Sequence, residues 1–410
     1  MRTWIIEPRD PLIARDGRPF SASPGARAAT LPFPFPSTII GAFRTRAGRN
    51  GDGIFDRSKI SAVKEIGLRG PLLVQLNPQG EIEDWFVPSP ADVLLLKCQA
   101  EDEAEIKRLT ALKLDKGKTN LPHNLQLVGM PIINPGKPHP QAPRFWRWDQ
   151  FKQWLLDPKE STIKISELGI EGLPQQLRTH VKIERRDSDL PLPSGVLSAS
   201  QTAEDGALFQ TRGLEFTHSS KSEKLSSVKR LALAAATDAP ALKGGFSAIG
   251  GERRIAAWRD GKCSQGKENL LASNCPAEVL NTIPPEEGQV QWHCRLVLLT
   301  PAYFKQGSQP DWLINSQSGL KVEIRAMVMN RYQVVSGWDF EKNEPKPARR
   351  LTPAGTVFFM ELTGEAKTII SWTKSIWMSC ISDEETDRRD GFGLAVIGNW
   401  NGIPEEIRNA

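Results

Sequence analysis

Two glycine-rich stretches carry residue types with which a protein can hold phosphate groups. Gly250-Gly251-Glu252-Arg253-Arg254 places flexible residues beside two arginines, so backbone N–H and guanidinium groups can approach one phosphate chain together. Gly391-Phe392-Gly393-Leu394-Ala395 is a second turn of this kind, without the arginines. Because glycine turns are common in β-rich proteins, a purely structural turn remains open for both stretches.

The sequence lacks the patterns of common catalytic and metal-binding sites, including GxxxxGK[ST], HExxH, GxSxG and the EF-hand loop. The 5 cysteines form no CxxC pair, which predicts a reducing, cytoplasmic location without structural zinc. Among the 5 histidines, only His180 is a candidate general acid or base, and an exposed polar residue without a catalytic role is the alternative. The acidic run at 383–390 lacks cation-loop spacing, so we interpret it as a solvated charged segment. We expect no metal and no cofactor.

Positive charge is concentrated in the first 50 residues. They contain eight Arg, no Lys and three acidic residues, so the net charge of this segment is 8 − 3 = +5. This equals the formal net charge of the whole chain, +5. Arginine without lysine favours bidentate contacts to phosphates or bases. Nucleic acid is therefore the first partner to consider, and acidic protein surfaces remain a second possibility.

These arginines flank a predicted strand and helix. The strand at 4–6 ends at prolines, which cannot donate to a sheet. Ser37 or Thr38 is predicted to cap a helix that ends near Gly48. One helix face is apolar and suits the core, and the other is small and basic and suits a phosphate backbone; the second carries Ser37, Gly41, Arg44 and Gly48. A capped helix that simply packs on a neighbour is the alternative.

The rest of the chain predicts two α+β units. A hairpin follows the helix, with its strands within 62–76 and 82–87 and a turn at 77–80, which gives the first half of a βαββαβ arrangement. Proline-rich residues 88–144 form a predicted insertion with a helix at 101–113, and an aromatic core helix follows at 145–156. Alternation around 178–216 predicts a protruding hairpin arm, whereas 228–236 is equally compatible with a strand or a helix.

A boundary near 237–240 separates two predicted domains, 1–238 and 239–410. The second contains strands at 290–299, 321–335 and 356–362, a long basic loop at 336–351 and a glycine-punctuated end, so a second βαββαβ-like unit is predicted. No apolar run is long enough to span a membrane, so no membrane-spanning segment is expected.

Several motifs together resemble one protein family. They are Ile6-Glu7-Pro8, Arg15-Asp16-Gly17-Arg18-Pro19-Phe20, Leu31-Pro32-Phe33-Pro34, Pro36-Ser37-Thr38, Gly41-Ala42-Phe43-Arg44, Gly250–Arg254 and Gly337-Trp338-Asp339 with Pro345–Arg350 and Pro353–Val357. In this order they resemble the third-subunit family of Cmr complexes, RAMP-superfamily proteins of type III-B CRISPR effectors. His180–Ile183 with Gly206–Phe209 resembles the hairpin that RAMP proteins project.

The resemblance implies two ferredoxin-like (RRM-related) domains and a non-catalytic subunit of an antiviral ribonucleoprotein. Such a subunit holds the 5′ tag of the CRISPR guide RNA (crRNA) and bridges the large polymerase/cyclase-like subunit to the backbone RAMP subunit. It meets target RNA only indirectly. The expected RNA-binding residues are Arg15, Arg18, Ser37, Thr38, Gly41, Arg44, Lys182, Arg185, Arg186, Gly250, Gly251, Arg253, Arg254, Lys346, Arg349 and Arg350.

Two other functions remain open at this point. Related RAMP proteins cleave repeat RNA, so a guide-processing endoribonuclease that uses His180 is one alternative. A purely protein-binding scaffold, whose arginines meet acidic partner surfaces, is the other.

Overall fold

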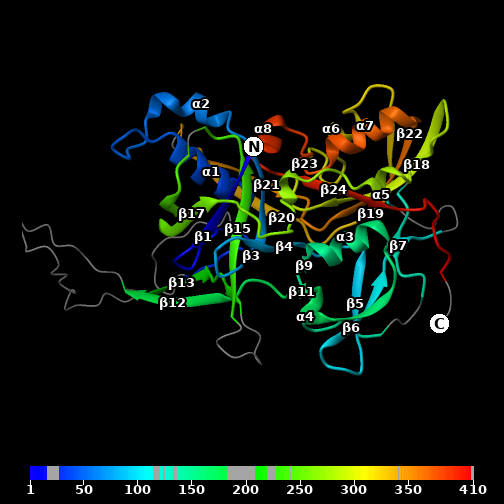
Figure 1. The fold of residues 1–410 in the computed structure, drawn as a ribbon, viewed down its shortest axis with the longest axis horizontal. Coiled ribbons are helices and arrows are strands. Elements are labelled where there is room, and N and C mark those ends of the chain that lie inside the picture. Colours follow the sequence, from blue (N-terminus) through cyan, green and yellow to red (C-terminus); the bar gives the residue numbers. More distant parts are fainter. Residues whose placement is uncertain are drawn as a thin grey trace, which may run out of the picture.

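Two antiparallel sheets form the centre of the molecule, with helices on their outer sides (Figure 1). The computed structural model describes residues 1–15, 27–113, 121–122, 125–132, 136–181, 208–218, 228–240, 242–339, 341–342 and 344–407. Buried apolar side chains from both sheets share one core, which includes Val74 and Ala234 of the first sheet and Val297 and Phe359 of the second. The chain is therefore a mixed α/β protein whose sheets pack against each other.

The first sheet contains β1 (Arg2–Pro8), β3 (Leu68–Leu76), β4 (Ile82–Pro88), β9 (Phe145–Arg147), β11 (Gly169–Ile170), β14 (Thr217–His218), β15 (Lys229–Thr237), β16 (Gly245–Ile249) and β17 (Arg254–Asp260). The main order is β11-β9-β4-β3-β15-β1-β17-β16, and β14 pairs with β15. The segment at 228–236, which periodicity could not assign, is the strand β15. Its seven residues from Leu231 to Thr237 are all buried, because small alanines let both faces of a central strand pack closely.

Helix α1 (Pro36–Ala47) and the short α2 (Ile60–Lys64) cover the outer face of this sheet. Ile39 and Phe43 pack into the core there, and Ala42 and Ala47 pack against it, as the helical spacing predicted. Ile40, which was not assigned to this face, is buried too. The expected side-chain cap is wrong. Phe35 occupies the N-cap position without a cap hydrogen bond and Pro36 begins the helix, because Phe35 is buried in a separate apolar cluster. The predicted end is confirmed, since Gly48 is the C-cap residue.

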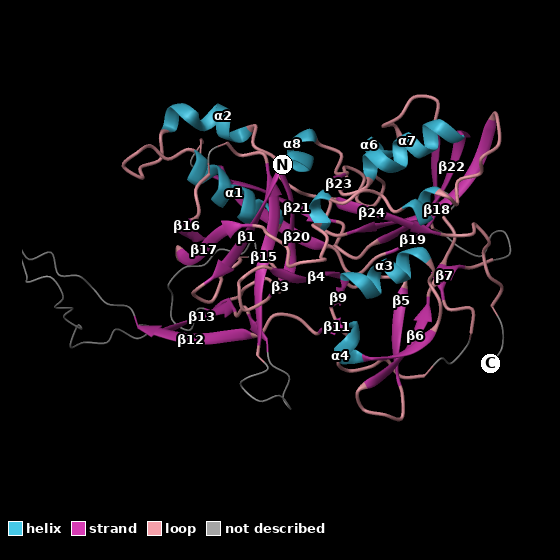
Figure 2. Cartoon of the chain, in the orientation of Figure 1, coloured by secondary structure: helices cyan, strands magenta, loops and turns pink. Residues whose placement is uncertain are grey.

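The second sheet contains β18 (Gln289–Leu298), β19 (Lys321–Val328), β22 (Val357–Glu365), β23 (Ser379–Cys380) and β24 (Leu394–Asn399), in the order β19-β22-β18-β24-β23. Its outer core includes residues of α5 (Ala277–Leu280), α6 (Asp311–Ile314) and α7 (Ala366–Ile376). The predicted basic loop at 336–351 is instead mostly a hairpin of β20 (Gln333–Asp339) and β21 (Glu344–Leu351). Figure 2 shows this predominance of strands.

Residues 88–144 add small strands beside the first sheet rather than a helix. They form β5 (Val93–Lys97), β6 (Glu103–Arg108), β7 (Thr110–Ala111) and β8 (Val128–Gly129), and β6 also pairs with β10 (Ser161–Lys164). The helix predicted at 101–113 is therefore wrong: Ala104 and Ile106 alternate with charged residues and point inward from a strand. The aromatic helix is α3 (Trp148–Leu156), whose four buried side chains, Trp148, Phe151, Trp154 and Leu155, are those predicted for its core face.

A long hairpin extends from the first half of the chain, at the lower left of Figure 1. Its strands, β12 (Gln175–Val181) and β13 (Leu208–Leu214), pair antiparallel along their whole length, and β2 (Arg27–Ala28) pairs parallel to β13. The sequence predicted the strands of a hairpin arm around 178–216, and β12 and β13 lie there.

A short helix, α4 (Ile165–Leu168), precedes the arm, and α8 (Glu385–Arg389) lies near the end of the chain. Among the described residues, no helix is long and apolar enough to cross a membrane.

Candidate nucleic-acid interface

The turn between β16 and β17 brings together predicted site residues that lie far apart in the sequence. Ile249 pairs with Arg254, so Gly250 to Arg253 form the connection, which we call the arginine turn. Gly251 N–H donates to the Ile13 carbonyl at 2.7 Å. A Cβ on Gly250 would lie 2.6 Å from the same carbonyl oxygen, so only glycine permits this approach. The turn therefore packs on the segment that ends in Arg15.

The backbone of the arginine turn is left-handed at two non-glycine residues. Glu252 and Arg253 both have left-handed backbones, with φ of 59° and 49°, which costs on the order of 1–3 kcal/mol each for non-glycine residues. Glu252 accepts from Arg15 at 3.3 Å. Within the described part of the chain, the guanidinium groups of Arg253 and Arg254 have no hydrogen-bond or ion-pair partner, and the Nε of Arg254 is buried. The Arg253 side chain is exposed to solvent, and that of Arg254 is half-buried.

Two other predicted arginines are held by α8 and the residue that follows it. Arg44 pairs with Asp390 at 2.7 Å and donates to the carbonyls of Lys64 and Ile66. Arg349 makes two hydrogen bonds of 2.8 Å to Asp387, which is buried. The interpretation of the acidic run as a solvated segment is thus wrong at Asp387, because this carboxylate balances an arginine from β21. Both cations connect parts of the fold, and their contact with RNA stays a prediction.

The remaining residues of the basic hairpin point to solvent. Lys346 and Arg350 are exposed on β21, and the Arg350 guanidinium lies 5.0 Å from the ring centroid of Tyr332. On α1, Ser37 and Thr38 are half-buried in the first turn, and a Cβ on Gly41 would meet no atom within 4 Å. The structure does not bring these residues into contact with the arginine turn.

Four of the predicted site residues lie outside the described residues: Arg18, Lys182, Arg185 and Arg186.

His180 lies on the arm strand β12, where its Nε2 is 2.9 Å from the Thr211 hydroxyl and its ring stacks on Phe209. In the described chain, no group of three or more His, Cys, Asp or Glu residues could hold a metal ion.

The second glycine stretch is a packed turn between the two sheets. Its backbone N–H groups are engaged: Gly391 donates to Arg388, Phe392 to Asp387 and Gly393 to Pro301. A Cβ on Gly391, whose φ is +95°, would lie 2.9 Å from the Gly70 carbonyl oxygen. This turn therefore offers no free N–H group to a phosphate, and the structural interpretation holds for it.

Sequence reasoning missed a third group of arginines. The buried carboxylate of Glu7 is surrounded by Arg9, which follows β1, Arg230 of β15 and Arg259 of β17. Period-two alternation in 254–260 places Ile255, Ala257 and Arg259 on one face. That signal concerns one strand only, and the order of the strands was needed to bring the three arginines together.

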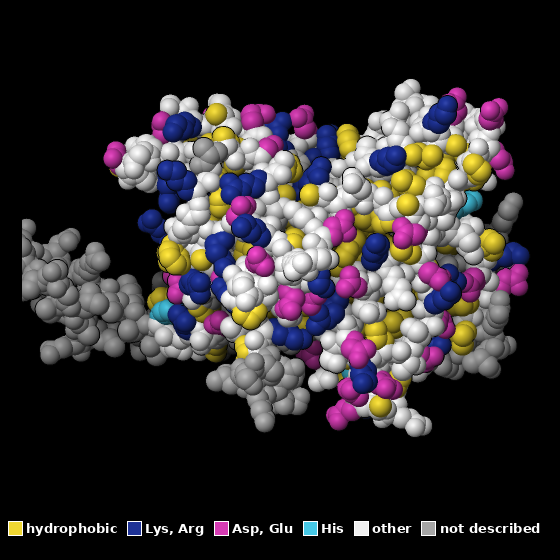
Figure 3. Space-filling model, viewed as in Figure 1, with side chains coloured by type: hydrophobic (Ala, Val, Ile, Leu, Met, Phe, Trp, Pro, Cys, Tyr) yellow, Lys and Arg dark blue, Asp and Glu magenta, His cyan; other side chains and the backbone are white. Residues whose placement is uncertain are grey.

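Charge is distributed unevenly over the face of the molecule in Figure 3. Lysine and arginine side chains gather over the half that contains α1, β1 and β17, whereas acidic side chains are frequent at the lower right, over β5 and β6. A positive patch of this kind attracts polyanions.

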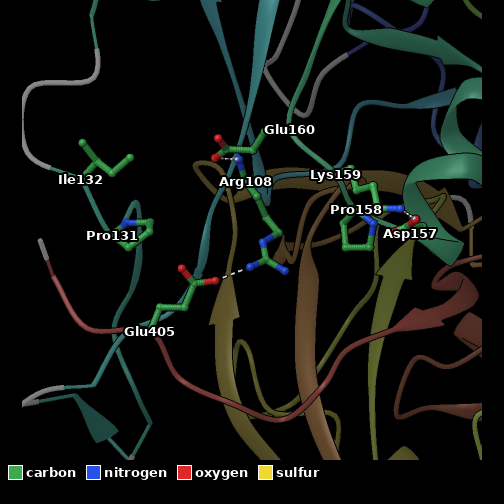
Figure 4. A pocket seen from close by; sticks show the side chains of 8 residues that line it. All are labelled: Arg108, Pro131, Ile132, Asp157, Pro158, Lys159, Glu160 and Glu405. Atoms are coloured by element: carbon green, nitrogen blue, oxygen red, sulfur yellow. Dashed lines mark hydrogen bonds and ion pairs between the residues drawn. The ribbon is translucent and has the colours of Figure 1, made fainter. Parts of the chain in front are cut away.

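A cavity of about 440 Å³ lies on the acidic side, at the end of β6 (Figure 4). Its lining residues are Arg108, Pro131, Ile132, Asp157, Pro158, Lys159, Glu160 and Glu405. Arg108 pairs with Glu405, and Lys159 pairs with Asp157. Because its carboxylates outnumber its cations and the cations are paired, the cavity is a poor site for a phosphate.

Over residues 4–400 the chain matches the protein family described as CRISPR-associated protein (Cas_Cmr3). No curated protein matches it. Among solved structures, it is similar to a chain in a cryo-EM structure of the type III-B Cmr-beta bound to cognate target RNA and AMPPnP, with 14% identity, coverage of 87% of this chain and 86% of that chain, and a TM-score of 0.44. For a chain of the type III-B Cmr-beta bound to cognate target RNA, the identity is 15%, the coverage 87% and 86%, and the TM-score 0.41. For a chain of the Csm3-Csm4 subcomplex of the type III-A CRISPR-Cas interference complex, the identity is 10%, the coverage 87% and 92%, and the TM-score 0.28. Similarities this low carry no inference about function.

Proposed function

Because the chain belongs to the CRISPR-associated Cmr3 family, we propose that it is a non-catalytic RNA-binding subunit of a type III-B CRISPR ribonucleoprotein. In this proposal it holds the 5′ tag of the guide RNA and bridges the large subunit to the backbone RAMP subunit in antiviral defence. The observation that carries the RNA site is the arginine turn, where Arg253 and Arg254, which have no partner among the described residues, lie beside the pair of Arg15 and Glu252. Guanidinium groups of this kind bind phosphates strongly.

We also propose that each sheet is a ferredoxin-like unit. The described strand order supports this: in β17-β1-β15-β3 and in β24-β18-β22-β19, the first strand along the chain lies between the third and the fourth, and the second is outermost. All these neighbours are antiparallel. In the first unit, β16 takes the place of the second helix.

The RNA site is tested by replacing the two arginines of the arginine turn. We expect Arg253→Ala with Arg254→Ala to weaken binding of guide RNA and to lower the salt slope of binding by about 0.7 for each lost phosphate contact. The measurement is a titration of fluorescently labelled guide RNA at several salt concentrations. The matched control is Lys367→Ala with Lys374→Ala, which removes the same charge from the exposed side of α7. Unchanged affinity and slope in the arginine variant would show that the turn does not hold RNA.

The absence of catalysis has its own test. We expect purified protein to leave repeat RNA uncut in the absence of divalent metal ions, because His180 is already engaged by Thr211 and Phe209. The measurement is gel analysis of the RNA after incubation. Cleavage that disappears in His180→Ala would overturn the proposal in favour of an endoribonuclease.

A further inference from the structure

Two apolar side chains are exposed on the face of the first sheet that points away from α1. Phe246 is 71% exposed and Ile255 is 41% exposed. Their neighbours Ile249 and Ala256 are buried in the core beneath α1. Because successive side chains of a strand point to opposite faces, Phe246 and Ile255 share the other face, where β16 and β17 extend beyond the joint core of the two sheets.

The register places this apolar pair next to the arginines around Glu7. Phe246 lies opposite Ala257, and Ala257 lies opposite Glu7, so Phe246 and Glu7 are two strand spacings, roughly 10 Å, apart. Arg9 N–H donates to the Ile255 carbonyl at 2.8 Å, which places Arg9 beside Ile255. The exposed ring, the aliphatic side chain and the charges therefore form one surface.

The arginines outnumber the carboxylate that holds them. The Oε2 of Glu7 lies 2.7 Å from the Nη2 atoms of Arg230 and Arg259 and 3.5 Å from that of Arg9. Burial alone would raise the pKa of Glu7, but the hydrogen bond from Arg230 and the charges of all three arginines outweigh it and hold this pKa below its usual value. Glu7 is thus ionised at neutral pH and cancels one of three positive charges. Glu7 and the three arginines together carry a net charge of +2, and the carboxylate of Asp10, which accepts from the Ile255 N–H at 3.1 Å, lowers the excess at this surface to +1.

We propose that this surface, made of Phe246, Ile255, Arg9, Arg230 and Arg259, is a stacking platform for single-stranded RNA. One base lies against the Phe246 ring with Ile255 beside it, and the arginines contact the adjoining phosphates. The platform continues from the arginine turn along the same two strands, so the proposal rests on the RNA-binding function proposed above. It adds base stacking to a site that otherwise consists of phosphate contacts.

Charge and size favour RNA over a protein as the occupant. A stable protein interface buries about 800 Å² on each partner around an apolar core, which is more than two exposed apolar side chains supply. A single nucleotide needs only one ring face and nearby cations, and stacking on an aromatic side chain tolerates any base. The excess positive charge complements the phosphates that accompany the base.

The test compares Phe246→Ala, Phe246→Tyr and Arg9→Ala in the full-length chain. The probe is a fluorescein-labelled single-stranded RNA of about 16 nucleotides, the upper end of the usual site size for stacked single strands. We expect Phe246→Ala to lower affinity roughly 5- to 150-fold without changing the salt slope, because the lost contact is uncharged. Phe246→Tyr retains affinity, and Arg9→Ala lowers the slope by about 0.7.

The controls separate failure of the platform from failure of the proposed function. Ile403→Ala, at a side chain that is 63% exposed near the C-terminus, should leave affinity unchanged. If wild-type protein fails to bind the RNA, both proposals are wrong. If Arg253→Ala with Arg254→Ala weakens binding but Phe246→Ala does not, only the platform is wrong. If Phe246→Ala spares RNA binding but prevents co-purification with other complex subunits, the face is a protein contact instead.

Discussion

Replacement of Asp92 by alanine is expected to lower the free energy of unfolding by about 3–5 kcal/mol, the cost of leaving a buried charge without its partner. Asp92 is fully buried, accepts from Trp154 Nε1 at 3.0 Å and pairs with Arg295, which is 1% exposed. Arg295 also donates to the carbonyls of Trp154 and Asn399. These bonds join the start of the insertion to α3 and to the second sheet. Chemical denaturation of purified protein measures the loss.

The ion pair between Asp92 and Arg295 contributes less to the free energy of unfolding than is lost when only one partner is removed. Replacing both partners, with Asp92→Ala and Arg295→Met, should restore a large part of the lost stability, because no buried charge then remains. Lys305→Ala is the matched control. Its pair with Glu384 joins two side chains that are 59% and 45% exposed, and such pairs contribute about 0–1 kcal/mol. Equal losses in Asp92→Ala and Lys305→Ala would contradict this account.

The second large effect separates two neighbouring arginines that the sequence assigns to one RNA-binding loop. Arg349→Ala is expected to destabilise the protein by about 2 kcal/mol, because it leaves the buried carboxylate of Asp387 without its bidentate partner. Arg350→Ala is expected to change stability by less than about 0.5 kcal/mol, because its guanidinium stacks on an exposed tyrosine. Thermal melting of both variants measures the difference.

RNA affinity provides the second measurement for this pair. If Arg349 serves the fold, Arg349→Ala binds RNA normally at temperatures where it remains folded. A variant that melts like wild type but has lost RNA affinity would show that Arg349 contacts RNA directly. Arg350→Ala tests the exposed side of the hairpin, because it removes a solvent-facing charge from the strand that carries Lys346.

Local patterns determined several parts of this protein correctly. The apolar residues of 145–156 recur at helical spacing, and α3 buries the four predicted side chains. The predicted end of α1 is also correct: the C-cap residue is Gly48, where a Cβ would lie 2.3 Å from the Phe55 ring. These features depend on interactions within a few residues, so composition and spacing are sufficient to predict them.

Local patterns failed where distant partners decide the conformation. The charged stretch at 101–113 has good helix formers, but pairing with β5 and β10 makes it a strand. The basic segment at 336–351 has many charges and prolines, yet Val335 and Leu351 enter a core with Phe35 and turn it into a hairpin.

By itself, the sequence determined that arginine and glycine are concentrated where a phosphate chain could be held, and that one family pattern spans the chain. Only the tertiary structure decided which of these arginines already have partners. Asp390 engages Arg44 and Asp387 engages Arg349, whereas Arg253 and Arg254 have no partner within the described residues. The physical reason is that a cation's availability depends on the carboxylates within about 4 Å of it. Here those carboxylates come from elements that only the order of strands brings near.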